Sequence, residues 1–250
     1  MESFKGEFGM ILFLTSSPSG ALDVPNDDHV LDESNAFVSN LKKYWKSEMK
    51  GLMISAYPDS YMANDEMTSF FEDCFRNSGV PVTNFTLWDD RSGEINVHDY
   101  DVIMLAGGHV PTQNAFFERI QLREKLVGYN GIVIGVSAGT INSASVVYAQ
   151  PELPTESYDP NYVRFIRGLN LTNINVLPHY QMVKNYHLDG KRLYEDITYP
   201  DSYGHKFLVL VDGSYVLQTK DTTLVYGESY IIKDGQMYPL CNENEVVTYE

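Results

Sequence analysis

The sequence predicts an α/β protein whose mostly parallel sheet is covered by helices on both faces. Over the first two thirds of the 250 residues, short apolar runs alternate with helical patterns, and this alternation is typical of successive βαβ units. Residues 101–106 and 131–136 are nearly all apolar, as expected for strands buried on both faces. Beyond residue 206 the runs shorten and are separated by dipeptides that favour tight hairpins, so we expect antiparallel strands to extend the sheet there.

The individual elements follow from apolar periodicity and from turn residues. Parallel strands are expected at residues 10–15, 51–56, 82–87, 101–106 and 131–136, helices at 33–44, 65–78, 111–126 and 138–148, and antiparallel strands at 207–211, 215–219, 223–226, 230–233 and 236–240. Gly79 is well placed to end the second helix and Pro111 to begin the third. Residues 150–161 are polar and contain prolines, which indicates a surface loop. With no repeat and no linker, we expect a single domain over residues 1–250.

Charge and composition exclude several classes of function. The hydrophobic content of 43% and charged content of 21% are those of an ordinary globular protein. A formal net charge of −16 repels phosphate backbones, so we expect no nucleic-acid partner. No apolar run approaches the length that spans a bilayer, so we expect no membrane partner. An anionic substrate would need a local cationic group to hold it.

Cysteine usage and the N-terminus indicate a cytoplasmic protein. Cys74 falls in an apolar helical pattern and Cys241 stands apart from it, so the two form neither a disulfide framework nor a metal-spaced set. Residues 1–9 carry acids as well as a lysine, and the apolar stretch 10–14 is too short for a signal-peptide core. We therefore expect a cytoplasmic location, no metal and no organic cofactor.

The segment Gly135-Val136-Ser137-Ala138-Gly139 has the form G-x-S-x-G and lies between a predicted strand and a predicted helix. In a nucleophile elbow, a sharp strand-to-helix turn presents the serine hydroxyl above the edge of the sheet. The glycines let the two elements approach closely, and the first amide of the helix can point at an oxyanion. The alternative is a plain glycine-rich junction. We favour Ser137 as a nucleophile and the Ala138 amide as an oxyanion donor.

A second junction, Gly107-Gly108-His109, ends the preceding buried strand. Parallel strands deliver their carboxyl ends to one edge of the sheet, where ligands collect. The amide of Gly108 is therefore a candidate for the second oxyanion donor, and His109 is a candidate substrate-binding residue. For Gly107 by itself, we prefer the interpretation as a tight turn that needs a glycine conformation.

His179 and Asp212 are the candidates for the general base and its supporting acid. Of the six histidines, His179 follows a short strand-like run that ends in proline, which would place it at the edge of the sheet. Asp212 follows the apolar run 207–211 and begins an Asp-Gly turn. Each could instead be an ordinary structural residue. Together with Ser137 they could form a Ser–His–Asp triad.

The order of these motifs resembles the peptidase E family, which includes the cyanophycinases and belongs to the class I glutamine amidotransferase-like superfamily. The likeness extends over residues 10–233 and rests on the glycine pair, the serine elbow, Pro178-His179-Tyr180 and the Asp-Gly-Ser segment at Asp212. It implies a flavodoxin-like three-layer α/β/α sandwich. It also implies a dipeptidase for N-terminal aspartyl substrates, with Ser137, His179 and Asp212 as the triad and Gly108 and Ala138 as oxyanion donors.

Two departures from the family pattern fall on substrate contacts. Aspartyl dipeptidases carry an arginine after the catalytic histidine in a Gly-Glu-Thr-Arg setting. Here the nearest match is Gly190-Lys191-Arg192, one residue short, so Arg192 is equally well interpreted as a substrate-binding residue or as an exposed cation. The glycine pair also continues through His109 rather than through the family's shorter turn. The partner we expect is a small peptide substrate, and the assembly stays open between monomer and homodimer.

Two other functions compete with this interpretation. An α/β-hydrolase esterase also uses G-x-S-x-G but orders its residues nucleophile, acid, histidine, which here would require Asp196 or Asp201 followed by His205. A non-catalytic amidotransferase-like binding module would carry a serine without an active base. The presence of both His179 and Asp212 argues against the second alternative.

Overall fold

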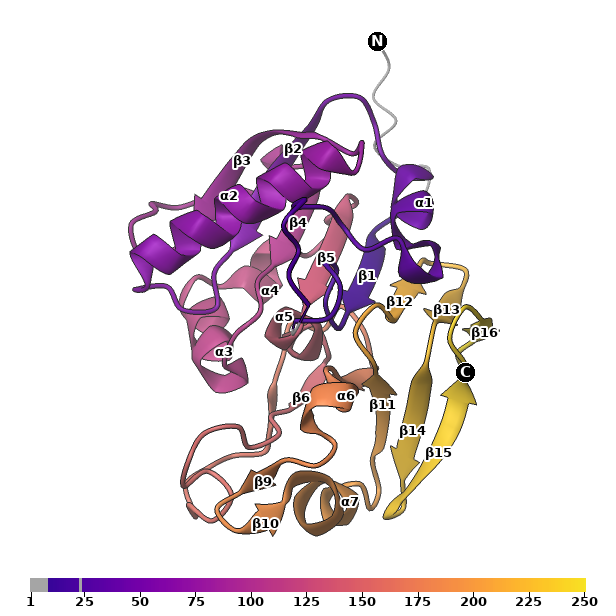
Figure 1. The fold of residues 1–250 in the computed structure, drawn as a ribbon. Helices are drawn as coiled ribbons and strands as arrows, with labels where there is room; N and C mark the ends of the chain where they lie inside the picture. Colours follow the sequence, from indigo (N-terminus) through magenta and orange to yellow (C-terminus); the bar gives the residue numbers. More distant parts are fainter. Residues whose placement is uncertain (1–8, 23) are drawn as a thin grey trace.

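The computed structural model describes residues 9–22 and 24–250, and most of the N-terminal stretch considered above for a signal sequence lies outside them. Its centre is an eight-stranded sheet in the order β16-β13-β12-β1-β5-β4-β2-β3 (Figure 1). The five strands β1-β5-β4-β2-β3 are parallel to one another. On the other side of β1, strands β12, β13 and β16 extend the sheet in antiparallel pairings. The eight strands are β1 Ile11–Thr15, β2 Met49–Ile54, β3 Val82–Trp88, β4 Val102–Leu105, β5 Ile132–Val136, β12 Tyr215–Gln218, β13 Thr223–Tyr226 and β16 Val246–Thr248.

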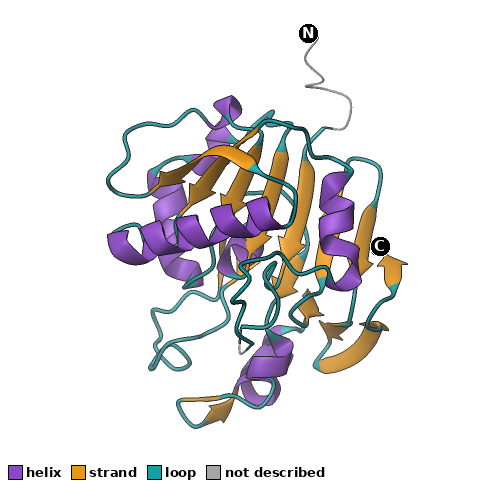
Figure 2. Cartoon of the chain, turned by 45° about the horizontal axis from the view of Figure 1, so that its top comes forward, coloured by secondary structure: helices purple, strands orange, loops and turns teal. Residues whose placement is uncertain are grey.

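Helices cover both faces of this sheet, as Figure 2 shows. The helices are α1 Phe37–Lys42, α2 Tyr61–Asn77, α3 Val110–Arg119, α4 Leu122–Lys125, α5 Ala138–Asn142, α6 Tyr180–Val183 and α7 Tyr199–Asp201, with 3-10 turns at Ser34–Ala36 and Val97–Asp99 and a π-helical stretch at Leu193–Thr198. Alternate side chains of β1 show the layering. Phe13 packs with α1 and α2, whereas Leu12 and Leu14 pack with α3 and α4. The fold is the flavodoxin-like α/β/α sandwich that the family resemblance implied.

A second, four-stranded sheet was not expected from the sequence. It consists of β8 Asn175–Leu177, β11 Lys206–Leu210, β14 Ser229–Lys233 and β15 Gln236–Cys241, in the order β15-β14-β11-β8. Strands β8 and β11 are parallel, and the other two pairings are antiparallel. One face of it, through Val176, Leu208 and Leu210, joins the core cluster on the α3 side of the main sheet. Its other face packs under residues 193–198.

The prediction that every C-terminal strand extends the main sheet is therefore wrong for β11, β14 and β15. The dipeptides Asp212-Gly213 and Gly227-Glu228 do not close hairpins but carry the chain from one sheet to the other. Only Asp234-Gly235 closes a hairpin as expected, with Lys233 paired to Gln236. A dipeptide sets the local turn, but which strand pairs with which depends on which faces the core can bury.

Two predicted helices also differ from the observed ones. The helix expected at 138–148 ends at Asn142, because Val146–Tyr148 forms strand β6 and pairs with β7, Phe165–Arg167. The helix expected at 111–126 is interrupted where Gln121 adopts a left-handed conformation, with φ 55°. A short hairpin of β9, His187–Leu188, and β10, Lys191–Arg192, completes the fold. No helix among the described residues is long and apolar enough to cross a membrane.

Candidate active site

Ser137 lies at a strained turn between β5 and α5. Its backbone has φ 50° and ψ −110°, a conformation that side-chain-bearing residues adopt only when the surrounding structure enforces it, at a cost of about 1–3 kcal/mol. The flanking glycines explain how the turn is enforced. A Cβ at Gly135 would lie 2.8 Å from the Thr140 amide nitrogen, and one at Gly139 would lie 2.2 Å from the Leu105 carbonyl oxygen. The observed turn therefore has the geometry of the predicted nucleophile elbow.

The end of β1 holds the elbow on its other side. The carbonyl oxygen of Thr15 accepts hydrogen bonds from the Ser137 amide at 3.2 Å and from the Thr140 hydroxyl at 2.8 Å. The Thr15 hydroxyl donates to the carbonyl of Gly135 at 2.6 Å. These bonds fix the serine at the centre of the main sheet.

The glycine pair at the end of β4 lies beside the elbow. A Cβ at Gly107 would be 3.4 Å from the Cβ of Ser137. A Cβ at Gly108 would be only 2.6 Å from that of Ala56, so no larger residue fits there without movement. Within the described chain, neither the Gly108 amide nor the Ala138 amide donates a hydrogen bond to another residue. Both amides are thus available for the predicted oxyanion contact, which stays a prediction.

Buried amide side chains connect the glycine-pair turn to the elbow helix. Gln113 donates to the carbonyl of Ala106 at 2.6 Å, and Asn142 donates to Gln113 and to the carbonyl of Val110 at 3.0 Å each. Because these groups are buried and hydrogen-bonded, they resist relative movement of α3 and α5.

His179 and Asp212, far apart in the sequence, are hydrogen-bonded. The Nδ1 atom of His179 lies 2.7 Å from Oδ1 of Asp212. His179 follows β8 and Asp212 follows β11, and these two strands are parallel neighbours in the second sheet. The carboxylate is fully buried, whereas the imidazole is 15% exposed. The pair leaves Nε2 of the imidazole available for another group.

Hydrogen bonds keep Asp212 ionised despite its burial. Burial raises the pKa of this carboxyl group, but hydrogen bonds from His179, Ser16 and Gln181, together with the electrostatic attraction of His179, outweigh the burial and hold the pKa below its ordinary value. The Ser16 hydroxyl lies 2.5 Å from Oδ1, and the Gln181 amide lies 2.5 Å from Oδ2. An ionised carboxylate here can orient the imidazole and stabilise its protonated form.

The structure does not join all three predicted triad members by hydrogen bonds. In the described chain, the Ser137 hydroxyl has no hydrogen bond to His179. Ser137 lies on the main sheet, and the other two residues lie on the second sheet, contrary to the expectation that all three share one edge. Such contacts are often long in a resting enzyme and tighten only when substrate binds.

His109 is a buried residue at the start of α3, and both of its ring nitrogens have partners in the chain. Nδ1 lies 2.7 Å from the Thr112 hydroxyl, and Nε2 lies 2.9 Å from a carboxylate oxygen of Glu156. A direct contact between this ring and a substrate would require one of these bonds to be exchanged. Its predicted binding role stays a prediction.

Arg192 lies in β10 and is engaged by a neighbouring acid. Its side chain is 54% exposed and makes two hydrogen bonds to the carboxylate of Asp196, at 3.0 and 2.7 Å. A substrate carboxylate would have to compete with Asp196 for this guanidinium group. The alternative interpretation as an exposed cation describes the resting structure.

The residues that an α/β-hydrolase would need are engaged elsewhere. Asp196 pairs with Arg192, and Asp201 pairs with Arg164. His205 stacks on Phe165, with ring centroids 4.2 Å apart. Neither acid is hydrogen-bonded to this histidine in the described chain, whereas His179 does have its carboxylate.

Ser16 and Gln181 were not predicted from the sequence as site residues. Ser16 directly follows β1, at the same edge of the sheet as Ser137, and Gln181 lies two residues after His179. Their positions after a predicted strand and beside a candidate base were a usable signal. Their contacts with Asp212 were not, because they depend on how the two sheets meet.

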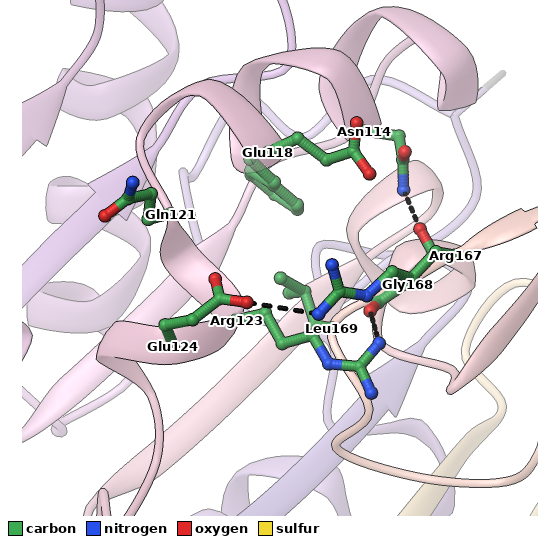
Figure 3. A pocket seen from close by; sticks show the side chains of 9 residues that line it. Asn114, Glu118, Gln121, Arg123, Glu124, Arg167, Gly168 and Leu169 are labelled. Carbon is green, nitrogen blue, oxygen red and sulfur yellow. Dashed lines mark hydrogen bonds and ion pairs between the residues drawn. The ribbon is translucent and has the colours of Figure 1, made fainter.

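A polar surface pocket of about 400 Å³ is separate from the candidate active site (Figure 3). It is lined by parts of α3 and α4 and by the end of β7. There, Arg123 donates to the carbonyl of Gly168 and Arg167 pairs with Glu124. None of the predicted site residues lines it. No group of three or more His, Cys, Asp or Glu side chains within residues 9–22 and 24–250 is arranged to hold a metal ion.

Comparisons with known proteins agree with the fold and with the family resemblance. The model of peptidase family S51 matches residues 39–226. The structure of a peptidase from an acI-B1 actinobacterium has a TM-score of 0.64 and 16% identity, covering 98% of this chain and 99% of that one. A structure from Listeria monocytogenes EGD-e, described under the name peptidase E, has a TM-score of 0.52 and 16% identity, covering 93% and 99%. No curated protein matches the chain by sequence.

The family match identifies the chain, with its flavodoxin-like sheet and strained serine turn, as a serine-type peptidase. The chain belongs to peptidase family S51, the peptidase E family. The family resemblance drawn from the motif order is thereby confirmed, and the α/β-hydrolase alternative is not supported.

Proposed function

We propose that the protein is a dipeptidase that cleaves small peptides with an N-terminal aspartate through a Ser137–His179–Asp212 triad. The observation that carries the triad is the 2.7 Å hydrogen bond between His179 and the buried, ionised Asp212. The second support is the strained backbone of Ser137 at the end of β5. The preference for aspartate rests on the family resemblance.

The reaction is an acyl transfer to water. As the Ser137 hydroxyl attacks the peptide carbonyl, Nε2 of His179 accepts its proton, and the new C–O bond produces a tetrahedral oxyanion. The amides of Gly108 and Ala138 hold that oxyanion, each worth about 3 kcal/mol by analogy with donors removed from other enzymes. His179 then gives the proton to the leaving amine as the C–N bond breaks. Water, deprotonated by the same imidazole, hydrolyses the acyl-enzyme and restores Ser137.

The substrate's charge poses a problem that the protein must solve locally. An aspartyl side chain adds a negative charge to a substrate that approaches a chain of net charge −16. Arg192 is the candidate cation, provided that the substrate displaces Asp196 from it. If it does, truncating Arg192 removes binding for aspartyl substrates alone.

The test combines a fluorophosphonate probe with a panel of dipeptides that differ in their N-terminal residue. We expect the wild-type protein to be labelled and to cleave aspartyl dipeptides fastest, and Ser137→Ala to lose both labelling and turnover while its melting temperature stays nearly unchanged. Turnover that survives Ser137→Ala would refute the nucleophile. In Arg192→Ala we expect a loss confined to aspartyl dipeptides, and an equal loss for every dipeptide would refute the role of Arg192.

A further inference from the structure

Ser16 lies where the two sheets of the candidate site meet. It is fully buried and directly follows β1 of the main sheet. Its hydroxyl donates to Oδ1 of Asp212 at 2.5 Å and accepts from the backbone amide of His179 at 2.8 Å. Nδ1 of His179 lies 3.4 Å from the same oxygen. One hydroxyl therefore contacts both members of the histidine–aspartate pair.

Because the site is divided between two sheets, a contact that joins them directly at the histidine–aspartate pair has a positioning role to fill. Hydrogen bonds within β8 and β11 fix His179 relative to Asp212, but they do not fix either residue relative to Ser137. The carbonyl of Thr15 accepts from the Ser137 amide, so Ser16 is one residue away from the bond that holds the elbow. A short covalent and hydrogen-bonded path thus connects the elbow, Thr15, Ser16 and the pair.

Gln181 contacts the same carboxylate but does not connect the His179–Asp212 pair to the main sheet. It also binds the Asp212 amide through its side-chain oxygen, at 3.1 Å. It belongs to α6, which follows His179 directly, so its bonds reinforce the second sheet from within. Among the described residues that contact the carboxylate of Asp212, Ser16 is the one that comes from the main sheet.

The chemistry of the hydroxyl matches this position. A serine hydroxyl has one donor and two acceptor sites, and here the donor is used on a carboxylate, a stronger partner than a neutral oxygen. We propose that Ser16 is a positioning residue that holds the His179–Asp212 pair in place relative to Ser137. Its effect on turnover rests on the proposed function, whereas its effect on the pair does not.

The kinetic test compares Ser16→Ala with Ser17→Ala. Ser17 is the adjacent residue and is also buried, at 3% exposure, so the same truncation probes the same segment without removing a contact to the pair. We expect Ser16→Ala to lower kcat and the rate of fluorophosphonate labelling by about 10- to 100-fold with KM changed by less than about threefold, because a small misplacement affects mainly the transition state. Ser17→Ala should stay near the wild-type rate.

A second measurement does not depend on activity. The proton shared by His179 and Asp212 should give a downfield resonance in the NMR spectrum of the resting protein, assignable by its loss in Asp212→Asn. We expect this resonance to shift or broaden in Ser16→Ala and to be retained in Ser17→Ala. Ser16→Cys, which keeps the shape of the side chain but has a larger and weakly donating thiol, should give intermediate values and serves if Ser16→Ala does not fold.

The outcomes separate this inference from the proposed function. If the wild-type protein is active and Ser16→Ala matches Ser17→Ala in both rate and resonance, the positioning role is wrong and the peptidase assignment stands. If the wild-type protein is neither labelled nor active, the proposed function fails, and the NMR resonance by itself tests the positioning role of Ser16. A resonance perturbed only in the Ser16 variants would support the positioning role, and an unchanged one would overturn it.

Discussion

At the scale of single residues, Asp212 is the most constrained group of the candidate site. Its two carboxylate oxygens accept hydrogen bonds from His179, Ser16 and Gln181. Together these bonds lower its pKa against the opposing effect of burial. The carboxylate is thus held both in its charged form and in one orientation. The hydrogen bond to His179 is observed, and the catalytic role of the pair stays a prediction.

Asp212→Asn should reduce kcat by about 10⁴-fold, as the same change does in a well-studied serine protease. The NH2 group of asparagine can only donate, so when it faces His179 the imidazole must carry its proton on Nε2, the nitrogen that has to be free to accept the Ser137 proton. The measurement is steady-state turnover of the fastest dipeptide of the panel, with circular dichroism to confirm the fold.

Asp73→Asn provides the matched control for that change. Asp73 also lies near a histidine, His29, at 3.5 Å, but both side chains are at least 40% exposed on the surface. Asp73 also pairs with the exposed Arg76. We expect turnover in Asp73→Asn to stay within about twofold of wild type, since exposed surface ion pairs contribute little. A comparable loss in the two variants would refute a specific role for Asp212.

At the scale of elements, the elbow depends on close contact between α5 and β4. The sequence predicted the strand, the turn and the start of the helix, because glycines at both ends of G-x-S-x-G restrict the local backbone. It did not predict that the helix ends at Asn142, since the chain after it pairs with β7. The local pattern was sufficient to predict where this helix begins. Where it ends depends on the pairing of the following residues with a distant strand, which the local pattern does not contain.

Gly139→Ala should destabilise the protein by about 1–3 kcal/mol or more, because the added methyl group would lie 2.2 Å from the Leu105 carbonyl oxygen. The free energy of unfolding, measured by urea denaturation, tests this. Gly93→Ala is the control, since nothing lies within 4 Å of the added carbon, and we expect a change within about 0.5 kcal/mol. Equal stability of the two variants would show that α5 can move away from β4 without cost.

At the scale of the whole molecule, the net charge of −16 acts on any charged substrate that approaches the protein. If aspartyl dipeptides are the substrates, long-range repulsion slows their approach, and added salt screens it. The Debye length falls from about 30 Å at 0.01 M salt to about 8 Å at 0.15 M. We expect kcat/KM for aspartyl dipeptides to rise over that range, while kcat/KM for dipeptides with an uncharged N-terminal side chain changes little.

Both substrates should be measured in one buffer series, and kcat/KM for the aspartyl dipeptide divided by kcat/KM for the uncharged one. Effects of salt on the protein itself cancel in this ratio. A ratio that stays constant would mean that the global charge does not act on the substrate. A ratio that falls would indicate a locally attractive site, with Arg192 as the first residue to examine.

The sequence by itself determined the local features of this protein. The parallel strands, the serine elbow and the glycine pair follow from short segments, where periodicity and backbone restrictions act directly. The acidic charge follows from the composition of the whole chain, and the motif order was sufficient to indicate the family.

Only the tertiary structure decided how the site is assembled. It placed Ser137 on one sheet and the hydrogen-bonded His179 and Asp212 on another, turned Asp212-Gly213 from an expected hairpin into a crossing between sheets, and brought Ser16 to the carboxylate. These contacts join residues up to 196 positions apart. They depend on which apolar faces are buried together, and no local pattern in the chain encodes that choice.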